Sequence, residues 1–105
     1  MDFDSFTLVL LRRPDDAPDL PEAELERIQG EHIAYMEAQR AAGVLLANGP
    51  FVDQDDVSLR GVCIYALGLE EARAVAARDP SVLANRLEPV LVTWLCPPGL
   101  ARFGV

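Results

Sequence analysis

The sequence predicts one α+β domain whose strands and helices follow the order βαββαβ. Apolar segments of strand length lie near both ends of the chain, and two stretches with helical spacing of apolar residues lie between them. Two further apolar runs between the helices flank an acidic connection, which is typical of a hairpin. With half of the residues hydrophobic, the whole chain, 1–105, is long enough for one modest core and too short for two.

The first strand and the first helix are marked by their ends. Ser5 to Leu11 is rich in β-forming residues and stops before Pro14, where a polar loop begins. Pro21 suits the first turn of a helix, and the glutamates that follow it complement the helix dipole. Because Gly43 is a typical helix end, the first helix is predicted from Pro21 to Gly43.

A hairpin follows this helix. Val44 to Ala47 is predicted as a short second strand that runs into Asn48-Gly49-Pro50, a sequence typical of a turn or bulge. After the acidic connection Asp53 to Ser58, the third strand is predicted from Arg60 to Leu67. The short connection indicates that these two strands are antiparallel.

The last third of the chain contains a second helix and a final strand. Gly68 to Arg78 has helical spacing and stops at Asp79-Pro80, and Ser81 to Asn85 adds one helical turn. The small residues of the second helix allow a close approach to a sheet. Glu88 to Leu95 is predicted as the fourth strand.

The order βαββαβ is that of a ferredoxin-like fold, in which two helices cover one face of a four-stranded antiparallel sheet with strand order 4-1-3-2. The first and last strands are nevertheless apolar on both faces. On the first strand the two faces carry Phe6, Leu8 and Leu10 against Val9 and Leu11. Since two helices cover a single face, a second copy of the chain is the simplest cover for the other. We therefore expect a homodimer in which two sheets form a dimeric α+β barrel.

Charge and hydropathy exclude several partners. The net charge is -8 and all nine basic residues are arginine, so the chain lacks a basic stripe that would neutralise the phosphates of nucleic acid. The chain contains no apolar run long enough to span a bilayer, and its first residues do not resemble a secretion signal. These patterns predict a cytoplasmic protein that binds neither nucleic acid nor membrane.

The cysteines and the histidine are too few and too scattered for a metal site. Cys63 and Cys96 lie on the third and fourth strands, which the first strand separates, so we expect two reduced core residues. The chain has one histidine and no cysteine cluster. We expect no metal and no cofactor.

His32, the only histidine, lies in the middle of the inward face of the first predicted helix. At helical spacing it falls on the same arc as Ile28, Tyr35 and Met36. An imidazole that points inward is either a proton-transferring group or a core histidine whose ring nitrogens are satisfied by neighbouring oxygens.

Asp79 is the second candidate, and it also has a structural explanation. An Asp before Pro80 is well suited to cap a helical turn. The end of the second helix lies on the same side of the sheet as His32, so the carboxylate is also placed within reach of the imidazole. Gly49 and Pro50 are open to two interpretations as well, a simple turn or a stretch of backbone that approaches a ligand closely.

Short motifs that span almost the whole chain are His32-x-x-Tyr35-Met36, the segment Gly43 to Pro50, Gly61, and Asp79-Pro80-Ser81-Val82-x-Ala84-Asn85-Arg86. Together they resemble the YCII-related (YciI-like) family. The resemblance implies a dimeric α+β barrel with His32 and Asp79 as an acid/base pair and with Gly49 and Pro50 shaping the pocket. One departure is Asn85, where many relatives have glycine.

Two functions are open. In the first, His32 takes or returns a proton next to a carbonyl group while Asp79 orients the ring, as in a lyase or isomerase acting on a lactone or similar carbonyl compound. Arg12, at the end of the first strand, then either holds a substrate carboxylate or contacts solvent. In the second, the chain is a non-catalytic dimeric module that binds a ligand or accompanies another enzyme. A cavity open to His32 favours the enzyme, and a ring packed on all sides favours the module.

Overall fold

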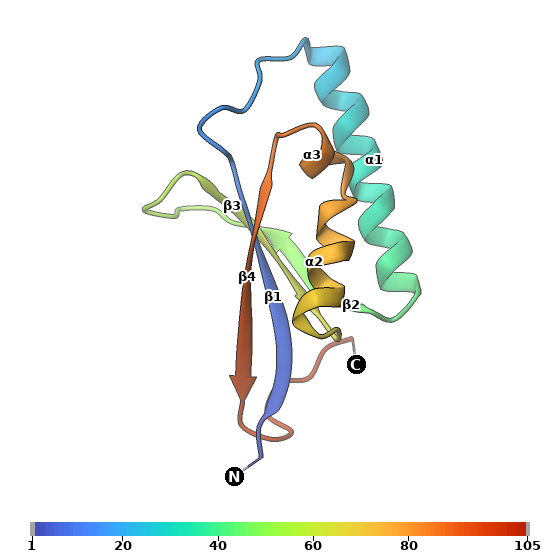
Figure 1. Ribbon diagram of the computed structural model, residues 1–105, viewed down its shortest axis with the longest axis vertical. Coiled ribbons are helices and arrows are strands. Elements are labelled where there is room, and N and C mark those ends of the chain that lie inside the picture. Colours follow the sequence, from blue (N-terminus) through green and yellow to red (C-terminus); the bar gives the residue numbers. More distant parts are fainter. Residues whose placement is uncertain (1, 105) are drawn as a thin grey trace.

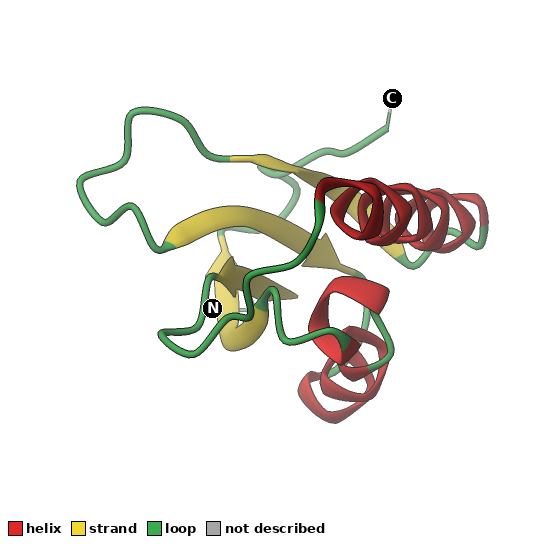
Figure 2. Cartoon of the chain, turned by 90° about the horizontal axis from the view of Figure 1, so that it is seen from above, coloured by secondary structure: helices red, strands yellow, loops and turns green. Residues whose placement is uncertain are grey.

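The computed structural model, which describes residues 2–104, has the predicted element order and sheet. Its elements are β1 (Asp4–Arg12), α1 (Glu22–Ala41), β2 (Leu45–Pro50), β3 (Leu59–Tyr65), α2 (Leu69–Ala77), α3 (Pro80–Leu83) and β4 (Glu88–Cys96). The strands form one antiparallel sheet in the order β2-β3-β1-β4, which is the predicted order 4-1-3-2 read from the other edge. The helices lie on one side of this sheet (Figures 1 and 2). The predicted α+β fold of ferredoxin-like topology is confirmed.

The helices begin and end where the sequence places their boundary residues. Pro21 directly precedes α1, and Gly43 follows its last turn with φ +79, a conformation that favours glycine. Gly68 and Arg78 flank α2, so both predicted ends of this helix hold within one residue. The ends of the helices that carry His32 and precede Asp79 are therefore set by residues next to them in the sequence.

Alternation along the strands separates a buried face from an open one. In β1 the residues Thr7, Val9 and Leu11 face the helices and are buried. On the same face Ala72 and Ala76 of α2 are 0% and 2% exposed, because their small side chains let this helix lie close to the sheet. The buried core cluster consists of Val9, Leu11, Met36, Leu45, Cys63, Tyr65, Ala72 and Ala76.

The opposite face of the sheet is also apolar. The strand register pairs Phe6 with Trp94 and Leu8 with Val92, and neither residue of β4 is buried: Trp94 is 36% exposed and Val92 is 42% exposed. The Phe6 ring lies 5.8 Å from that of Trp94 and 5.4 Å from that of Phe103, measured between centroids. Phe103, near the C-terminus, thus covers part of this face. The helices of residues 2–104 all lie on the other side of the sheet (Figure 2).

The second strand is longer than predicted. It was expected to end at Ala47, but Asn48, Gly49 and Pro50 continue it and pair with β3. Proline is tolerated here because β2 is an edge strand, where a missing backbone N–H removes no ladder bond on the open side. Gly61 of β3 makes the pairing possible, since a Cβ at this position would lie 2.7 Å from the carbonyl oxygen of Gly49.

Two further expectations concern the membrane and the cysteines. No helix within residues 2–104 is both long enough and apolar enough to cross a membrane. Cys63 and Cys96 are buried and free. The strand that separates them is β1, in accordance with the predicted topology.

We predict that Gly61→Ala destabilises the protein. Its methyl group would meet the backbone of β2 and force the edge strand to move, which should lower the free energy of unfolding by about 1–3 kcal/mol. The measurement is equilibrium denaturation in urea. Gly30→Ala is the control, because a Cβ at Gly30 has no neighbour within 4 Å and alanine favours the helix. A Gly61→Ala protein as stable as the wild type would contradict the close approach.

Candidate active site

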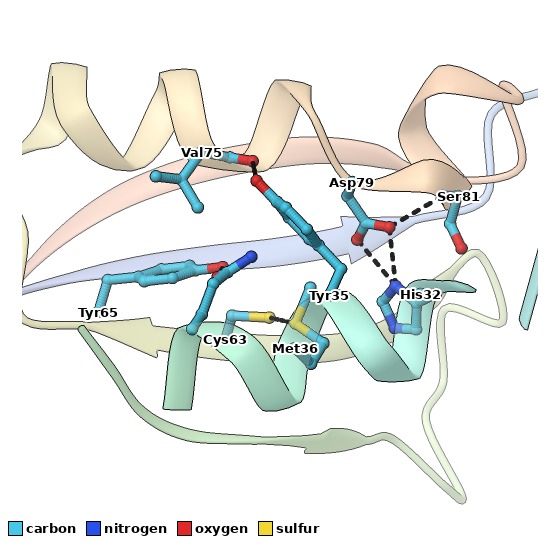
Figure 3. A network of polar contacts seen from close by, with 9 residues as sticks. His32, Tyr35, Met36, Cys63, Tyr65, Val75, Asp79 and Ser81 are labelled. Carbon is cyan, nitrogen blue, oxygen red and sulfur yellow. Dashed lines mark hydrogen bonds and ion pairs between the residues drawn. The ribbon is translucent and has the colours of Figure 1, made fainter. Parts of the chain in front are cut away.

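His32 and Asp79 lie in direct contact although 47 positions separate them in the chain. His32 projects from α1, and Asp79 directly precedes α3 (Figure 3). The Nδ1 atom of the imidazole is 2.8 Å from both carboxylate oxygens. Asp79 is 1% exposed, whereas the side chain of His32 is 15% exposed. The structure thus brings the two candidate residues together.

The position of Asp79 follows from its role as a helix cap. Its carboxylate accepts a hydrogen bond of 2.9 Å from the backbone N–H of Ser81, and Pro80 occupies the first helical position. The capping role and the histidine contact are therefore not alternatives. One buried carboxylate makes both.

The carboxylate selects the tautomer of the imidazole. A carboxylate accepts hydrogen bonds, so Nδ1 of His32 carries the ring proton and its N–H donates a hydrogen bond to Asp79. Nε2 is then the basic ring nitrogen, and it has no hydrogen-bond partner within residues 2–104. A histidine oriented by a carboxylate in this way is suited to accept and return a proton.

Neighbouring contacts fix the rotation of α1 that points His32 at Asp79. The hydroxyl of Tyr35 donates a 2.7 Å hydrogen bond to the backbone carbonyl of Val75 and so ties α1 to α2. One residue further, Met36 packs into the core and accepts a contact of 3.7 Å from the thiol of Cys63 (Figure 3). With Tyr35 and Met36 held, a rotation that turned His32 away would break both contacts.

A cavity of about 380 Å³ opens beside His32, between α1 and the β2–β3 edge of the sheet. Gly49, Pro50 and Gly61 line it. Gly61 pairs with Leu11 on the face that the helices cover, so its missing side chain leaves room between sheet and helix. The candidate residues Gly49 and Pro50 are therefore part of the cavity wall.

Arg12 does not line this cavity. Its guanidinium forms an ion pair of 2.7 Å with Glu88, its neighbour across the strands. The reason is strand alternation, since Leu11 faces the helices and Arg12, the next residue, points away from them.

Besides Asn48, six polar residues line the cavity without having been singled out as candidate site residues from the sequence: Gln29, Glu37, Arg40, Arg60, Ser81 and Arg86. Helical spacing could have found Gln29 and Arg40, because positions three before and eight after His32 lie near it on the helix surface. The placement of Arg60, Ser81 and Arg86 depends on how β3 and the segment after α3 approach α1, which local patterns do not specify.

Comparison with known proteins identifies the family. The family model of the YCII-related domain matches residues 7–95. The chain belongs to the YCII-related domain family. Among solved structures it is similar to 5-chloro-2-hydroxyhydroquinone dehydrochlorinase (TftG) from Burkholderia phenoliruptrix AC1100 in complex with 2,5-dihydroxybenzoquinone. The TM-score is 0.56 at 19% sequence identity, over 87% of this chain and 93% of that chain, a likeness of fold. No curated protein matches the chain.

The departure of this YCII-related chain at Asn85 has a local explanation. Asn85 adopts φ +57, a left-handed conformation that glycine takes most readily and asparagine tolerates better than most residues. Its side-chain amide also donates a 3.1 Å hydrogen bond to the carboxylate of Asp16. The backbone turn after α3 is thus kept without glycine.

The other reactive side chains near the cavity are a cysteine thiol and a tyrosine hydroxyl, and both are buried. Cys63 lines the cavity, but burial, followed by the nearby charge of Asp79, raises the pKa of this thiol to about 12, so it stays protonated near neutral pH. Burial also raises the pKa of Tyr65. Within residues 2–104, no three His, Cys, Asp or Glu side chains group together as a metal site.

A double-mutant cycle tests whether His32 and Asp79 interact in solution. The single variants His32→Ala and Asp79→Ala each remove the contact, and the lost cap of α3 in Asp79→Ala is common to both arms of the cycle and so cancels. We expect a coupling of about 1–2 kcal/mol in the free energy of unfolding, because the pair is buried and hydrogen-bonded. Denaturation of the four proteins provides the measurement. Additive effects would mean that the side chains do not meet.

Proposed function

We propose that this chain is a small-molecule enzyme in which His32 transfers a proton next to a carbonyl group and Asp79 orients and stabilises the ring. The substrate is a lactone or similar carbonyl compound, and the reaction is an elimination or an isomerisation. The observation that carries the proposal is a carboxylate-oriented imidazole whose free nitrogen belongs to a residue lining a cavity.

The proposed reaction needs only proton movement and a shift of electron pairs. Nε2 of His32 accepts a proton from the carbon beside the carbonyl, and the C–H electrons form an enolate. Asp79 stabilises the resulting imidazolium through its contact with Nδ1. In an isomerisation, His32 returns the proton to another carbon. In an elimination, the enolate electrons expel a leaving group such as chloride.

Two findings support an enzyme over the non-catalytic dimeric module. His32 lines a cavity large enough for a small ring compound and is not packed on all sides. The structurally similar TftG is named as a dehydrochlorinase and is bound to 2,5-dihydroxybenzoquinone, a small carbonyl compound. A purely structural pair would need neither the cavity nor the residual exposure of the ring.

The proposed enzyme is a homodimer that associates through the open face of the sheet. Phe6, Leu8 and Trp94 contribute to a continuous apolar surface there, and a monomer rarely exposes such a surface to water. The same surface on a second copy would cover it, because a two-fold contact matches a patch with itself.

Val92→Glu should weaken this dimer. A carboxylate in the middle of the open face would be desolvated upon association, so we expect a shift from dimer to monomer in light scattering at micromolar concentration. Leu83→Glu is the matched control, since Leu83 is 72% exposed on α3, in the helical layer. A wild-type protein that is monomeric at this concentration would refute the assembly.

Proton transfer is best tested without knowing the physiological substrate. Small lactones and keto acids are incubated with the protein in deuterated water, and deuterium incorporation beside the carbonyl is followed by NMR. We expect the wild type to accelerate exchange for at least one compound. His32→Ala should reduce that acceleration by about 100-fold or more, since the proton acceptor is lost. Asp79→Asn should also reduce it, because an amide no longer stabilises the imidazolium.

Arg27→Gln provides a control in the same helix. It removes the exposed ion pairs of Arg27 with Glu24 and Glu31 but leaves the imidazole, its carboxylate and the Tyr35 contact in place. Its exchange rate should remain within a few-fold of the wild type. If all compounds exchange equally fast with wild type and His32→Ala, the acid/base proposal fails and the binding module gains support.

A further inference from the structure

We propose that Ser81 and Arg86 bind the oxygen atoms of the ligand and make the cavity selective for carbonyl compounds that carry a negative charge. The inference rests on the proposed function and deepens it by naming the class of substrate and the residues that select it. Both residues line the cavity with His32 and lie in or directly after α3.

The hydroxyl of Ser81 is the first observation. Ser81 is 3% exposed, and its backbone N–H is already used in the contact with Asp79. Its side-chain oxygen has no hydrogen-bond partner within residues 2–104, and the atom is not fully enclosed by protein, since Gln39 Nε2 is the only enclosed side-chain N or O atom without a partner in that range. Since Ser81 lines the cavity, its hydroxyl is available to a ligand beside the His32–Asp79 pair (Figure 3).

Arg86 is the second observation. Its backbone N–H donates a 2.9 Å hydrogen bond to the carbonyl of Ser81, which fixes the start of its side chain next to that residue. Within residues 2–104 its guanidinium has no carboxylate within ion-pair distance, and the same holds for Arg40 and Arg60, the other two arginines that line the cavity. The positive charge of Arg86 is therefore not neutralised by a carboxylate of the described residues and is available to a ligand.

The charges around the cavity point the same way. Besides the His32–Asp79 pair, the charged residues that line it are three arginines and one glutamate, namely Arg40, Arg60, Arg86 and Glu37. The lining is therefore positive in a chain whose net charge is -8. The excess positive charge would attract a carboxylate or an ionised hydroxyl on a ligand, whereas it would contribute little to the binding of a neutral ligand.

The same donors suit the proposed reaction. Proton removal beside a carbonyl places negative charge on the carbonyl oxygen, and fixed hydrogen-bond donors lower the energy of that state. With Nε2 of His32 as the base, Ser81 and Arg86 supply an O–H and a guanidinium from the same side of the cavity as Asp79. Base and donors are thereby held on α1 and on the segment around α3.

The test compares a charged probe with its neutral counterpart. γ-Carboxy-γ-butyrolactone and its methyl ester are titrated into isotope-labelled protein, and amide shifts of cavity residues give both dissociation constants. The wild type should bind the carboxylate about tenfold or more tightly than the ester. Arg86→Gln should remove this preference by weakening carboxylate binding while ester binding is unchanged. Ser81→Ala should weaken both probes by about three- to tenfold, and it retains the backbone N–H that contacts Asp79.

The controls separate this inference from the acid/base proposal. Arg78→Gln removes a positive charge from the exposed end of α2, outside the cavity, and should leave both constants unchanged. His32→Ala should lose deuterium exchange but retain the preference for the carboxylate. Equal affinity of the wild type for both probes, no shift of cavity amides with either, or a preference that survives Arg86→Gln would overturn the inference. The expected binding pattern without any exchange would uphold the binding role and refute the proposed catalysis.

Discussion

The buried carboxylate of Asp79 is the constraint to which the rest of the candidate active site is tied. A carboxylate that is 1% exposed requires several donors, because an unpaired charge in the interior is strongly unfavourable. It has the backbone N–H of Ser81 on one side and the imidazole of His32 on the other. The first contact begins α3, and the second holds α1 against the segment that follows α2. The carboxylate that helps to hold the helical layer together therefore also orients the imidazole.

The sheet supports this arrangement in two different ways. On the covered face, Val9, Cys63 and Ala72 fill the core, while Gly61 lines the cavity and allows the backbone of β2 to approach β3 closely. On the open face, the apolar residues of β1 and β4 take no part in the cavity. The covered face of the sheet therefore contributes to the cavity, and the open face is the surface proposed to contact a second copy of the chain.

Most of the fold could be predicted from the sequence because it depends on local signals. Pro21, Gly43 and the Asp79-Pro80 pair define helix ends, and two-sided apolar strands indicate a second contact surface. The extent of β2 could not be predicted, because Asn48-Gly49-Pro50 is typical of a turn and becomes a strand only through pairing with β3. That pairing depends on Gly61, 11 residues after Pro50 in the chain.

The candidate residues divide in the same manner. His32 and Asp79 were identifiable, since helix periodicity and a capping sequence each fix one side chain, and the topology places both on one side of the sheet. Arg12 was proposed from its position at a strand end, but strand alternation points it away from the helices and toward Glu88. Ser81 and Arg86 belong to the Asp79-to-Arg86 motif, but the sequence did not mark them as site residues, because the lack of a partner for each side chain is visible only in three dimensions.

The segment from Asp79 to Arg86 concentrates several roles in eight positions. Its first residue orients the imidazole and caps α3, and the following turn places Ser81 and Arg86 at the cavity. Backbone atoms make the contacts that hold this turn, namely the N–H of Ser81 to Asp79 and the N–H of Arg86 to Ser81. The side chains at positions 81 and 86 are therefore free to vary without disturbing the His32–Asp79 pair. A chain with the same Asp-Pro turn and other residues at these two positions would keep the proton-transferring pair and bind a ligand of different charge.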